Sequence, residues 1–270
     1  MKSKSILWND NSISLNKFIS STGICSRREA DQWIEEARVT INGELAQKGN
    51  RVFPGDKVLL DGKPLKTRPA AIYLAFNKPV GIVCTTDQRE PKNIISYINY
   101  PKRLFPIGRL DKPSEGLIFL TNDGDIVNKI LRAGNQHEKE YIVTVDRPIN
   151  KRFVQRMSNG IPILGTVTKK CQVEQIGKAT FRIILVQGLN RQIRRMCEYL
   201  DYRVIKLKRI RIMNVDLGDL PKGKWRELTA QEVKQINKMV QHSSKTAEPK
   251  PPPAKTQKSR TNNNRRPRRK

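Results

Sequence analysis

The sequence predicts an α+β fold in two parts, and three observations support this. Residues 12–62 combine helical apolar spacing with tight turns, as expected of a small helix-rich module. Residues 63–70 are polar and turn-rich, which is typical of a linker. From 71 to 241, short apolar runs outnumber helical stretches and do not alternate with them. This pattern favours a mixed, largely antiparallel sheet over a doubly wound fold.

The small module is expected to begin with two helices. Leu15, Phe18 and Ile19 recur at helical spacing. Ser26 and Glu29 then form a capping box, in which each side chain accepts a hydrogen bond from the other residue's backbone amide. The second helix continues with apolar residues three or four positions apart, at Ala30, Trp33, Ile34 and Ala37. Two strands are predicted after it, at Val39–Ile41 and Val58–Leu60.

The larger domain is expected to contain five strands and four helices. Apolar or β-branched runs predict strands at 72–76, 81–85, 116–121, 140–145 and 180–186. Helical spacing predicts helices at 125–131, 151–158, 190–200 and 230–240. The last helix starts at a second capping box, formed by Thr229 and Glu232.

Charge indicates the class of partner. The chain has 53 Lys and Arg against 25 acidic residues, a net charge of +28. Such an excess needs a polyanion or a membrane surface. No apolar run approaches the roughly 18–20 residues that span a bilayer, and residues 1–11 lack the apolar segment of a signal peptide. Nucleic acid is therefore favoured over a membrane as the partner. Residues 1–11 are expected to be disordered.

Residues 242–270 predict a disordered basic tail. They hold ten Lys or Arg, one acidic residue and almost no apolar side chains. Such a segment cannot bury enough surface to offset the entropy lost on ordering. It serves either as a solubilising extension or as a sequence-independent attractant for RNA.

The cysteines give no sign of a metal site. The four residues are scattered and the chain has only two histidines. No C-x-x-C pair occurs, so a zinc site is not expected. Scattered cysteines without an export signal fit the reducing cytoplasm.

The N-terminal module carries candidates for RNA contact. Arg27 and Arg28 occupy the first turn of the second predicted helix, where free amides can bind phosphate although the helix dipole disfavours cations. The alternative is an ordinary solvated face. The order and spacing of 15–17, 23–30, 39–43 and 54–56 resemble the small RNA-binding domain shared by a small-subunit ribosomal protein and bacterial tyrosyl-tRNA synthetases. That resemblance implies contacts to structured RNA from Asn16, Lys17, Arg27 and Arg28.

Asp111 is the first candidate for chemistry. It ends the run Gly108-Arg109-Leu110-Asp111, just before an apolar stretch. A neighbouring guanidinium favours the ionised form, and an oriented carboxylate can act as a nucleophile or a base. An aspartate in this setting is more often a turn or ion-pair residue. Glycosidase-like chemistry usually needs a second carboxylate, and nothing shows that Glu115 converges with Asp111.

Two further segments carry candidate residues for the site. Asn190 can cap a helix on which Arg191, Arg194 and Arg195 cluster. That cluster either binds phosphate and reaches a carboxylate or forms a solvated basic face. Tyr141 lies in a predicted strand, where a tyrosine usually packs in the core. The alternative is an aromatic face that stacks on a nucleobase.

Together these segments resemble the pseudouridine synthases, in particular the branch that modifies single sites in ribosomal RNA. The matching pieces are 108–117, Lys139-Glu140-Tyr141, 188–196 and the stretch 77–81. An RNA-binding module followed by this core is also the domain order of that branch. The resemblance implies isomerisation of a uridine that is flipped out of its stack. Such a reaction requires no redox cofactor, nucleotide or metal.

The resemblance also implies residue roles. Asp111 is the expected nucleophile, Tyr141 is expected to stack on the uracil, and Arg194 is expected to pair with Asp111. Arg109 is expected to help displace the target nucleotide. Further contacts to RNA are expected from Leu110, Lys112, Arg191, Gln192 and Ile193. The sequence leaves open whether Asp111 acts on the base or on the sugar.

The substrate expected from the resemblance is a uridine of 23S ribosomal RNA, with a tRNA as a further candidate. One alternative is a non-catalytic RNA-binding factor of ribosome assembly, because the N-terminal module and the tail suit that function equally well. Another is a synthase of the same branch that acts on a small-subunit site or on tRNA. Nothing in the sequence indicates more than a cytoplasmic monomer.

Overall fold

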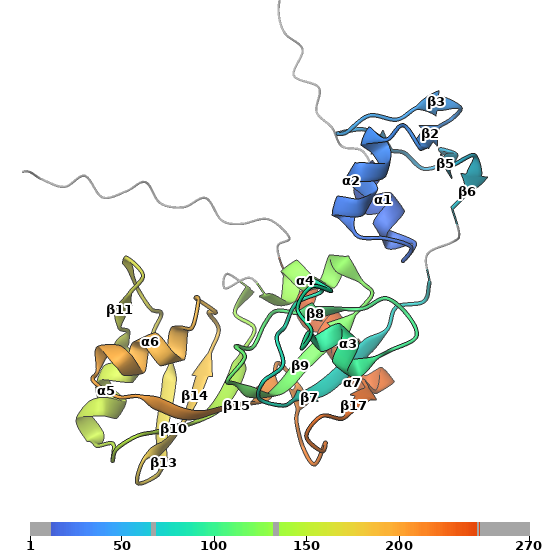
Figure 1. The fold of residues 1–270 in the computed structure, drawn as a ribbon. Coiled ribbons are helices and arrows are strands. Elements are labelled where there is room, and N and C mark those ends of the chain that lie inside the picture. Colours follow the sequence, from blue (N-terminus) through green and yellow to red (C-terminus); the bar gives the residue numbers. More distant parts are fainter. Residues whose placement is uncertain (1–11, 66–68, 132–134, 242, 244–270) are drawn as a thin grey trace, which may run out of the picture.

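The computed structural model describes residues 12–65, 69–131, 135–241 and 243. Its small N-terminal part stands next to a larger domain built on one long sheet (Figure 1). The predicted terminal segments 1–11 and 244–270 lie outside the described residues, as does 242. In the described part, no helix combines the length and the hydropathy that crossing a bilayer requires. That part also holds no group of three His, Cys, Asp or Glu side chains suited to a metal ion.

The N-terminal part has a hydrophobic core of its own. Helices α1 (Leu15–Ser21) and α2 (Arg27–Glu35) pack on it, and α2 begins at the predicted capping box. A four-stranded sheet has the order β3 (Glu44–Leu45), β2 (Val39–Ile41), β5 (Val58–Leu60) and β6 (Lys63–Pro64). A separate pair joins β1 (Ile13–Ser14) to β4 (Arg51–Val52). Since β6 pairs with β5, the first two residues of the expected linker belong to this sheet.

A nine-stranded mixed sheet forms the larger domain. Its main path runs β13 (Gln172–Gly177), β14 (Thr180–Leu185), β10 (Lys139–Val145), β15 (Val204–Ile212), β9 (Glu115–Thr121), β7 (Tyr73–Lys78) and β17 (Trp225–Glu227). Strand β16 (Val215–Asp216) pairs with β15, and β8 (Phe105–Ile107) pairs with β9. Every pairing is antiparallel except that of β9 with β15. The predicted α+β class with a mixed, largely antiparallel sheet is thus confirmed.

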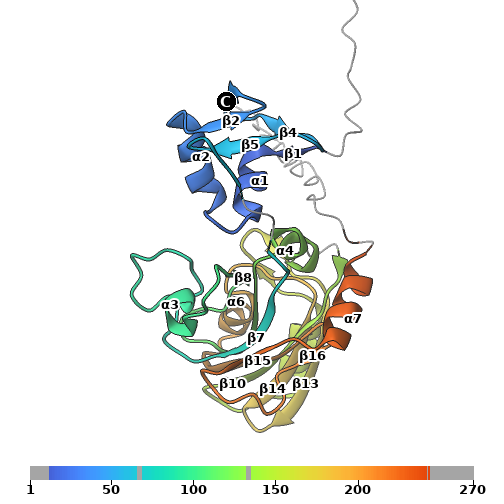
Figure 2. The same ribbon diagram turned by 90° about the vertical axis from the view of Figure 1, so that its right-hand side faces the viewer.

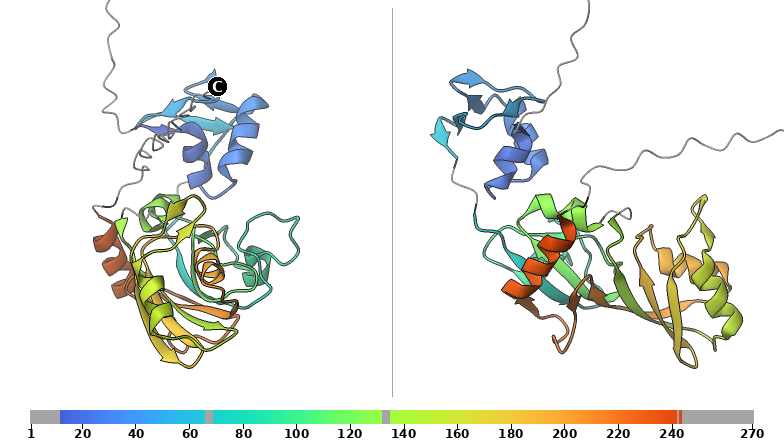
Figure 3. Two further views of the ribbon diagram at one scale, coloured as in Figure 1. Left: turned by 90° about the vertical axis from the view of Figure 1, so that its left-hand side faces the viewer. Right: turned by 180° about the vertical axis from the view of Figure 1, so that it is seen from behind.

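Helices cover both faces of this sheet (Figures 2 and 3). The main core joins β10 and β14 to α5 (Lys151–Asn159) and α6 (Gln192–Tyr199), and it extends to α3 (Ile94–Ile98). A second core lies under α4 (Gly124–Leu131) and α7 (Ala230–Val240). A short hairpin of β11 (Pro162–Ile163) and β12 (Thr166–Val167) stands beside α6.

One glycine makes the parallel junction at the centre of the sheet possible. Strands β9 and β15 pair only through Glu115 with Lys208 and Gly116 with Arg209. Gly116 has φ +104°, and a Cβ there would lie 2.2 Å from the carbonyl oxygen of Arg209. No side chain fits at such a distance. The close approach places the loop that precedes β9, which carries Asp111, next to β15.

One predicted strand is wrong, and one long strand was missed. Residues 81–85 do not form a strand, because only Val83 makes an isolated bridge, to Asn93. The longest strand, β15, was not anticipated, since cations interrupt its apolar pattern. The other predicted helices and strands form within a few residues of their expected positions.

Candidate active site

A cavity of about 420 Å³ opens between the loop before β9, strand β10 and the start of α6. Asp111, Tyr141 and Arg194 all line it, although they come from three separate segments. Its apolar walls are Leu110, Leu185, Leu189, Ile193 and Leu207. The volume lies within the range typical of small-molecule sites and accommodates one nucleotide base.

Asp111 and Arg194 form an ion pair without a hydrogen bond. Arg194 Nε lies 3.7 Å from Asp111 Oδ2, and this buried nitrogen has no hydrogen-bond partner. The Arg194 side chain is 9% exposed, whereas that of Asp111 is 34% exposed towards the cavity. The guanidinium is thus held beside a carboxylate that stays accessible to a ligand.

The rest of the guanidinium ties Arg194 to the loop around Asp111. Nη2 donates to Ser114 Oγ at 3.0 Å and to the Pro113 carbonyl at 3.2 Å, while Nη1 donates to the Val204 carbonyl at 3.3 Å. Burial lowers the pKa of Arg194 from its usual value, and the charge of Asp111 opposes that shift. Arg194 therefore fixes the position of the loop that carries Asp111.

A second buried cation, Lys78, also binds the loop around Asp111. Lys78 is fully buried, and its Nζ donates to the carbonyls of Ser114 at 2.7 Å and Pro79 at 2.9 Å. Burial lowers the pKa of Lys78, and the charges of Cys84 and Asp111 are among those that oppose the shift. The backbone amide of Ser114 also donates to the Asp111 carbonyl at 2.9 Å, which closes the turn.

Tyr141 both packs in the core and lines the cavity. It belongs to the main hydrophobic core and is 9% exposed. The guanidinium carbon of Arg209 lies 5.9 Å from the centre of its ring. Core packing and an aromatic face open to a ligand were alternatives in the sequence; core packing is confirmed, and the stacking role stays a prediction.

Comparison with known proteins identifies the kind of enzyme that has this site. A family model described as RNA pseudouridylate synthase matches residues 72–199, and an S4 domain model matches 14–58. The dual-specificity RNA pseudouridine synthase RluF of Escherichia coli strain K12 is 58% identical over 243 residues, which cover 89% of this chain and 84% of that protein. The chain belongs to the RNA pseudouridine synthase family.

Two further comparisons agree. Ribosomal large subunit pseudouridine synthase B of Bacillus subtilis strain 168 is 31% identical over 237 residues, covering 84% of this chain and 97% of that protein. A crystal structure of a pseudouridylate synthase superimposes with a TM-score of 0.62 at 28% identity, over 83% of this chain and 99% of that one. The predicted family is confirmed, and a catalytic synthase is favoured over a non-catalytic RNA-binding factor.

The remaining predicted residues of the synthase fall into two groups. Arg109 and Arg191 line the cavity and are exposed to solvent. Leu110, Gln192 and Ile193 are buried in its lining. Lys112 is exposed and lies outside the cavity lining.

The expected cap of α6 is wrong. The helix begins at Gln192, and Arg191 occupies the N-cap position with φ +49° and no side-chain capping bond. Asn190 instead accepts from Arg195, through its carbonyl oxygen at 3.1 Å and its Oδ1 at 3.3 Å. Arg194 points inward, so the three arginines of this segment do not form a single basic face.

The module that matches the S4 domain presents two of its four predicted residues freely. Asn16 donates to Asp31 Oδ1 at 2.9 Å, and Lys17 forms an ion pair with Asp125 of the larger domain. Arg27 and Arg28 are exposed and make no ion pair within the described residues. Those two arginines therefore have no carboxylate partner among the described residues.

Sequence reasoning missed two cations in the synthase cavity, Lys139 and Arg209. Both line it, and both are buried. Lys139 stood out only as a neighbour of Tyr141, and Arg209 lies in the strand that was not anticipated. One available signal was the run 204–212, whose alternation of apolar and basic residues breaks at Arg209 and Ile210.

Proposed function

We propose that this synthase converts a specific uridine of 23S large-subunit ribosomal RNA to pseudouridine, with Asp111 as the nucleophile. The observation that carries the proposal is the convergence of Asp111, Tyr141 and Arg194 on one cavity. The large-subunit substrate is supported by the name of the Bacillus subtilis relative, and a second RNA substrate, such as a tRNA, by the dual specificity named for RluF.

The proposed reaction uses the geometry directly. The target nucleotide leaves its stack, with Arg109 helping to displace it, and its base enters the cavity beside Tyr141. Asp111, ionised next to Arg194, attacks the nucleotide. The bond between C1′ and N1 breaks, the base turns, and a bond between C1′ and C5 forms. Because the product is an isomer, no group is consumed.

RNA attraction and site choice have different sources in this proposal. Arg27 and Arg28 on α2, together with the basic tail, bind phosphate, which contributes affinity without reading sequence. Arg191, Lys112 and their neighbours at the cavity mouth hold the strand that carries the target. Asn16 and Lys17 join the RNA contact once their present partners are displaced.

Location and assembly complete the proposal. We place the enzyme in the cytoplasm, because all four cysteines are free thiols and three of them are buried. A monomer is sufficient, since one chain supplies every predicted catalytic side chain.

The deciding experiment maps pseudouridines in ribosomal RNA and tRNA from a strain that lacks this gene. A single large-subunit uridine should lose its modification and regain it when the wild-type gene, but not Asp111→Asn, is restored. Loss at a small-subunit site, or in tRNA alone, would refute the substrate proposal while leaving the family assignment intact.

A further inference from the structure

Two buried cations lie on the floor of the cavity. Arg209 is 4% exposed and Lys139 is 7% exposed, and both line the same cavity as Asp111. Lys139 stands on β10 two residues before Tyr141, and Arg209 is the direct partner of Tyr141 on β15. The cavity-facing side of the sheet therefore presents two positive charges near Tyr141, and the guanidinium of Arg209 lies over the tyrosine ring.

Among the described residues, the protein bonds only some of the hydrogen-bond donors of each cation. Arg209 Nε donates to the Leu117 carbonyl at 2.6 Å, but its buried Nη2 has no partner. Lys139 Nζ donates to the His137 carbonyl at 2.8 Å, which uses one of its three hydrogens. Among the residues that the structure describes, no carboxylate lies within ion-pair distance of either group. Buried charge without a partner is costly, so a ligand is the expected partner.

Depth in the cavity indicates which part of a nucleotide meets these donors. Arg109 and Arg191 are exposed at the mouth, where they suit phosphates of the RNA backbone. Arg209 and Lys139 are buried in the lining, where Arg209 lies over the ring of Tyr141 and Lys139 stands two residues before Tyr141 on β10. A nucleotide that enters past the exposed arginines therefore meets these two buried donors with its base rather than with its phosphate.

We propose that Arg209 and Lys139 donate hydrogen bonds to the carbonyl oxygens of the flipped uracil and stabilise the negative charge that the ring gains during the reaction. This inference rests on the proposed function, since it requires the target base to occupy the cavity. The two residues are thus catalytic groups in addition to Asp111, Tyr141 and Arg194.

The chemistry requires such donors whichever carbon Asp111 attacks. Attack at C1′ breaks the C1′–N1 bond, and the bonding electron pair stays on the base, shared between N1, O2 and O4. Attack at C6 instead places the charge on C5 and O4. In either case C5 finally bonds to C1′ and the bond between Asp111 and the nucleotide breaks, so that Asp111 leaves as a carboxylate; the hydrogen of C5 leaves as a proton to water, and N1 gains a proton from water. Donors fixed where this charge develops lower the barrier.

The same donors select the base. Uracil offers an oxygen acceptor at position 4, whereas cytosine carries an amino group there, which only donates. A buried cation that faces position 4 donates a hydrogen bond to the oxygen of uracil. With cytosine, the cation and the amino group are both donors, so no hydrogen bond forms. Rejection of this kind is strong because the buried donors would remain unpaired.

The test combines a change in the enzyme with a change in the substrate. The substrate is an RNA fragment containing the uridine that the wild-type enzyme modifies, prepared with uridine, 2-thiouridine or 4-thiouridine at that position. Sulfur accepts hydrogen bonds more weakly than oxygen. Arg209→Gln should lower the single-turnover rate on uridine about 100-fold, as removal of one oxyanion donor does. On the thio substrate that lacks the contacted oxygen, the same substitution should lower the rate less than about 10-fold.

A matched control comes from the same strand. Arg211→Gln removes an equal charge two residues away, from a side chain outside the cavity, and should leave the rate on all three substrates within about 2-fold of wild type. Equal rate losses for Arg209→Gln on uridine and on both thio substrates would overturn the proposal. A rate loss that merely follows weaker RNA binding would overturn it as well. Failure of the wild-type enzyme on the uridine fragment would count against the proposed substrate instead.

A second variant keeps the test decisive if Arg209→Gln does not fold. Lys139→Met breaks only one hydrogen bond of the protein and keeps the length of the side chain. It should show the same pattern, with a rate loss of about 100-fold on uridine and a smaller loss on one thio substrate. Full activity of a folded Lys139→Met variant would remove Lys139 from the proposal, and equal losses on all three substrates would refute the role of the pair.

Discussion

Arg209 and Arg211 lie two residues apart on β15, yet their side chains point to opposite faces of the sheet. Regular pleating would put both on the same face. The pairing with β10 shifts register between Glu140 and Tyr141, so that Arg209 pairs with Tyr141 while Arg211 pairs with Glu140. Ile210 is the extra residue of this bulge. Bulges next to active sites commonly redirect a side chain, and this one sends Arg209 into the cavity.

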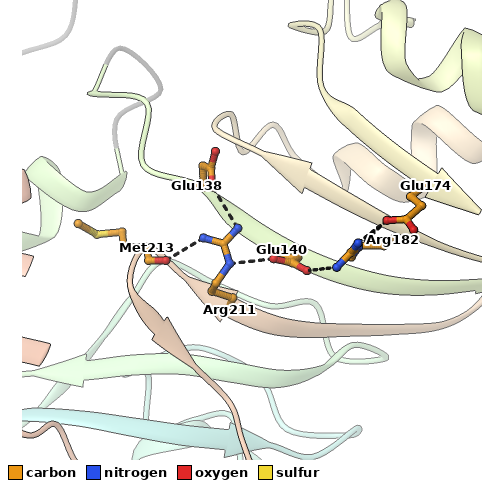
Figure 4. A network of polar contacts seen from close by, with 6 residues as sticks. All are labelled: Glu138, Glu140, Glu174, Arg182, Arg211 and Met213. Carbon is orange, nitrogen blue, oxygen red and sulfur yellow. Dashed lines mark hydrogen bonds and ion pairs between the residues drawn. The ribbon is translucent and has the colours of Figure 1, made fainter. Parts of the chain in front are cut away.

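Arg211 joins a chain of alternating charges on the outer face (Figure 4). Its Nε donates to Glu140 at 2.8 Å and its Nη2 to Glu138 at 3.0 Å, while Arg182 links Glu140 to Glu174. Arg211→Gln should lower the free energy of unfolding by about 2 kcal/mol, because it leaves the largely buried Glu140 with one weaker partner. Urea denaturation measures this loss. An unchanged stability would contradict the structural role given to the network.

Asp111→Asn should lower the single-turnover rate by roughly 10⁴-fold, as expected when a nucleophile is removed. The amide keeps the shape of the side chain, so RNA affinity should stay within about 3-fold of wild type. Tritium release from 5-tritiated RNA reports the rate, and filter binding reports the affinity. Asp87→Asn is a suitable control, since that carboxylate lies outside the cavity and pairs with Arg89. Turnover near the wild-type rate in Asp111→Asn would refute the nucleophile assignment.

Arg194→Lys tests whether a positive charge alone suffices beside Asp111. Lysine keeps the charge but cannot reproduce the bonds to Ser114, Pro113 and Val204. We expect the rate to fall about 10- to 100-fold and the free energy of unfolding to fall by about 2 kcal/mol. Single-turnover assays and urea titrations of the same preparation check both values. A variant with wild-type rate would show that the fixed geometry of the guanidinium is dispensable.

The sequence predicted elements well where a local signal exists. The capping boxes at Ser26 and Thr229 both formed, because they depend only on residues three positions apart. The cap at Asn190 failed, since Arg191 adopts a left-handed conformation that no neighbouring residue announces. The family resemblance predicted that Asp111, Tyr141 and Arg194 share one site. They line one cavity only because tertiary structure brings their three segments together. The position of Arg209 in the cavity could not be predicted from the sequence, because the direction of its side chain depends on a bulge in β15.

Lys139 should make the stability of the enzyme depend on pH. Burial, followed by the charge of Arg209, lowers the pKa of Lys139 to about 8 in the folded state. Below pH 8 the lysine is charged in both the folded and the unfolded chain, so the full cost of burying the charge is present. As the pH rises from 8 towards the unfolded value near 10.4, the folded form loses its proton first and the cost diminishes. Stability attributable to this residue should therefore rise over that interval.

Lys139→Met isolates this effect. It should increase the free energy of unfolding at pH 7 by about 1–3 kcal/mol and remove the gain between pH 8 and 10. Urea midpoints at pH 7 and 9.5, compared with wild type, check both changes. We therefore expect Lys139→Met to be more stable than wild type and less active, because active sites often retain groups that lower stability. If the variant were less stable than wild type at pH 7, the buried charge of Lys139 could not be a net cost to the folded state.

The rate should show the opposite dependence on pH. Only the protonated ammonium stabilises charge on the uracil, so the single-turnover rate should fall as the pH rises through about 8. The titratable groups that interact electrostatically with Lys139 are Arg209 on β15 and His137, two residues before it, and neither takes up negative charge. Lys139→Arg keeps its proton and should hold its rate to pH 9. An identical decline in both enzymes would assign the titration to another group.

Arg27 and Arg28 should account for much of the salt dependence of RNA binding by the N-terminal module. Removing one cation that binds a phosphate reduces the slope of log affinity against log salt by about 1, so Arg27→Gln with Arg28→Gln should reduce it by about 2. Affinity titrations between 50 and 200 mM salt measure this slope. Arg38→Gln is the matched control, because Arg38 in the same module already pairs with Asp61 and Glu36. An equal change in slope for both variants would mean that general charge, rather than the start of α2, attracts the RNA.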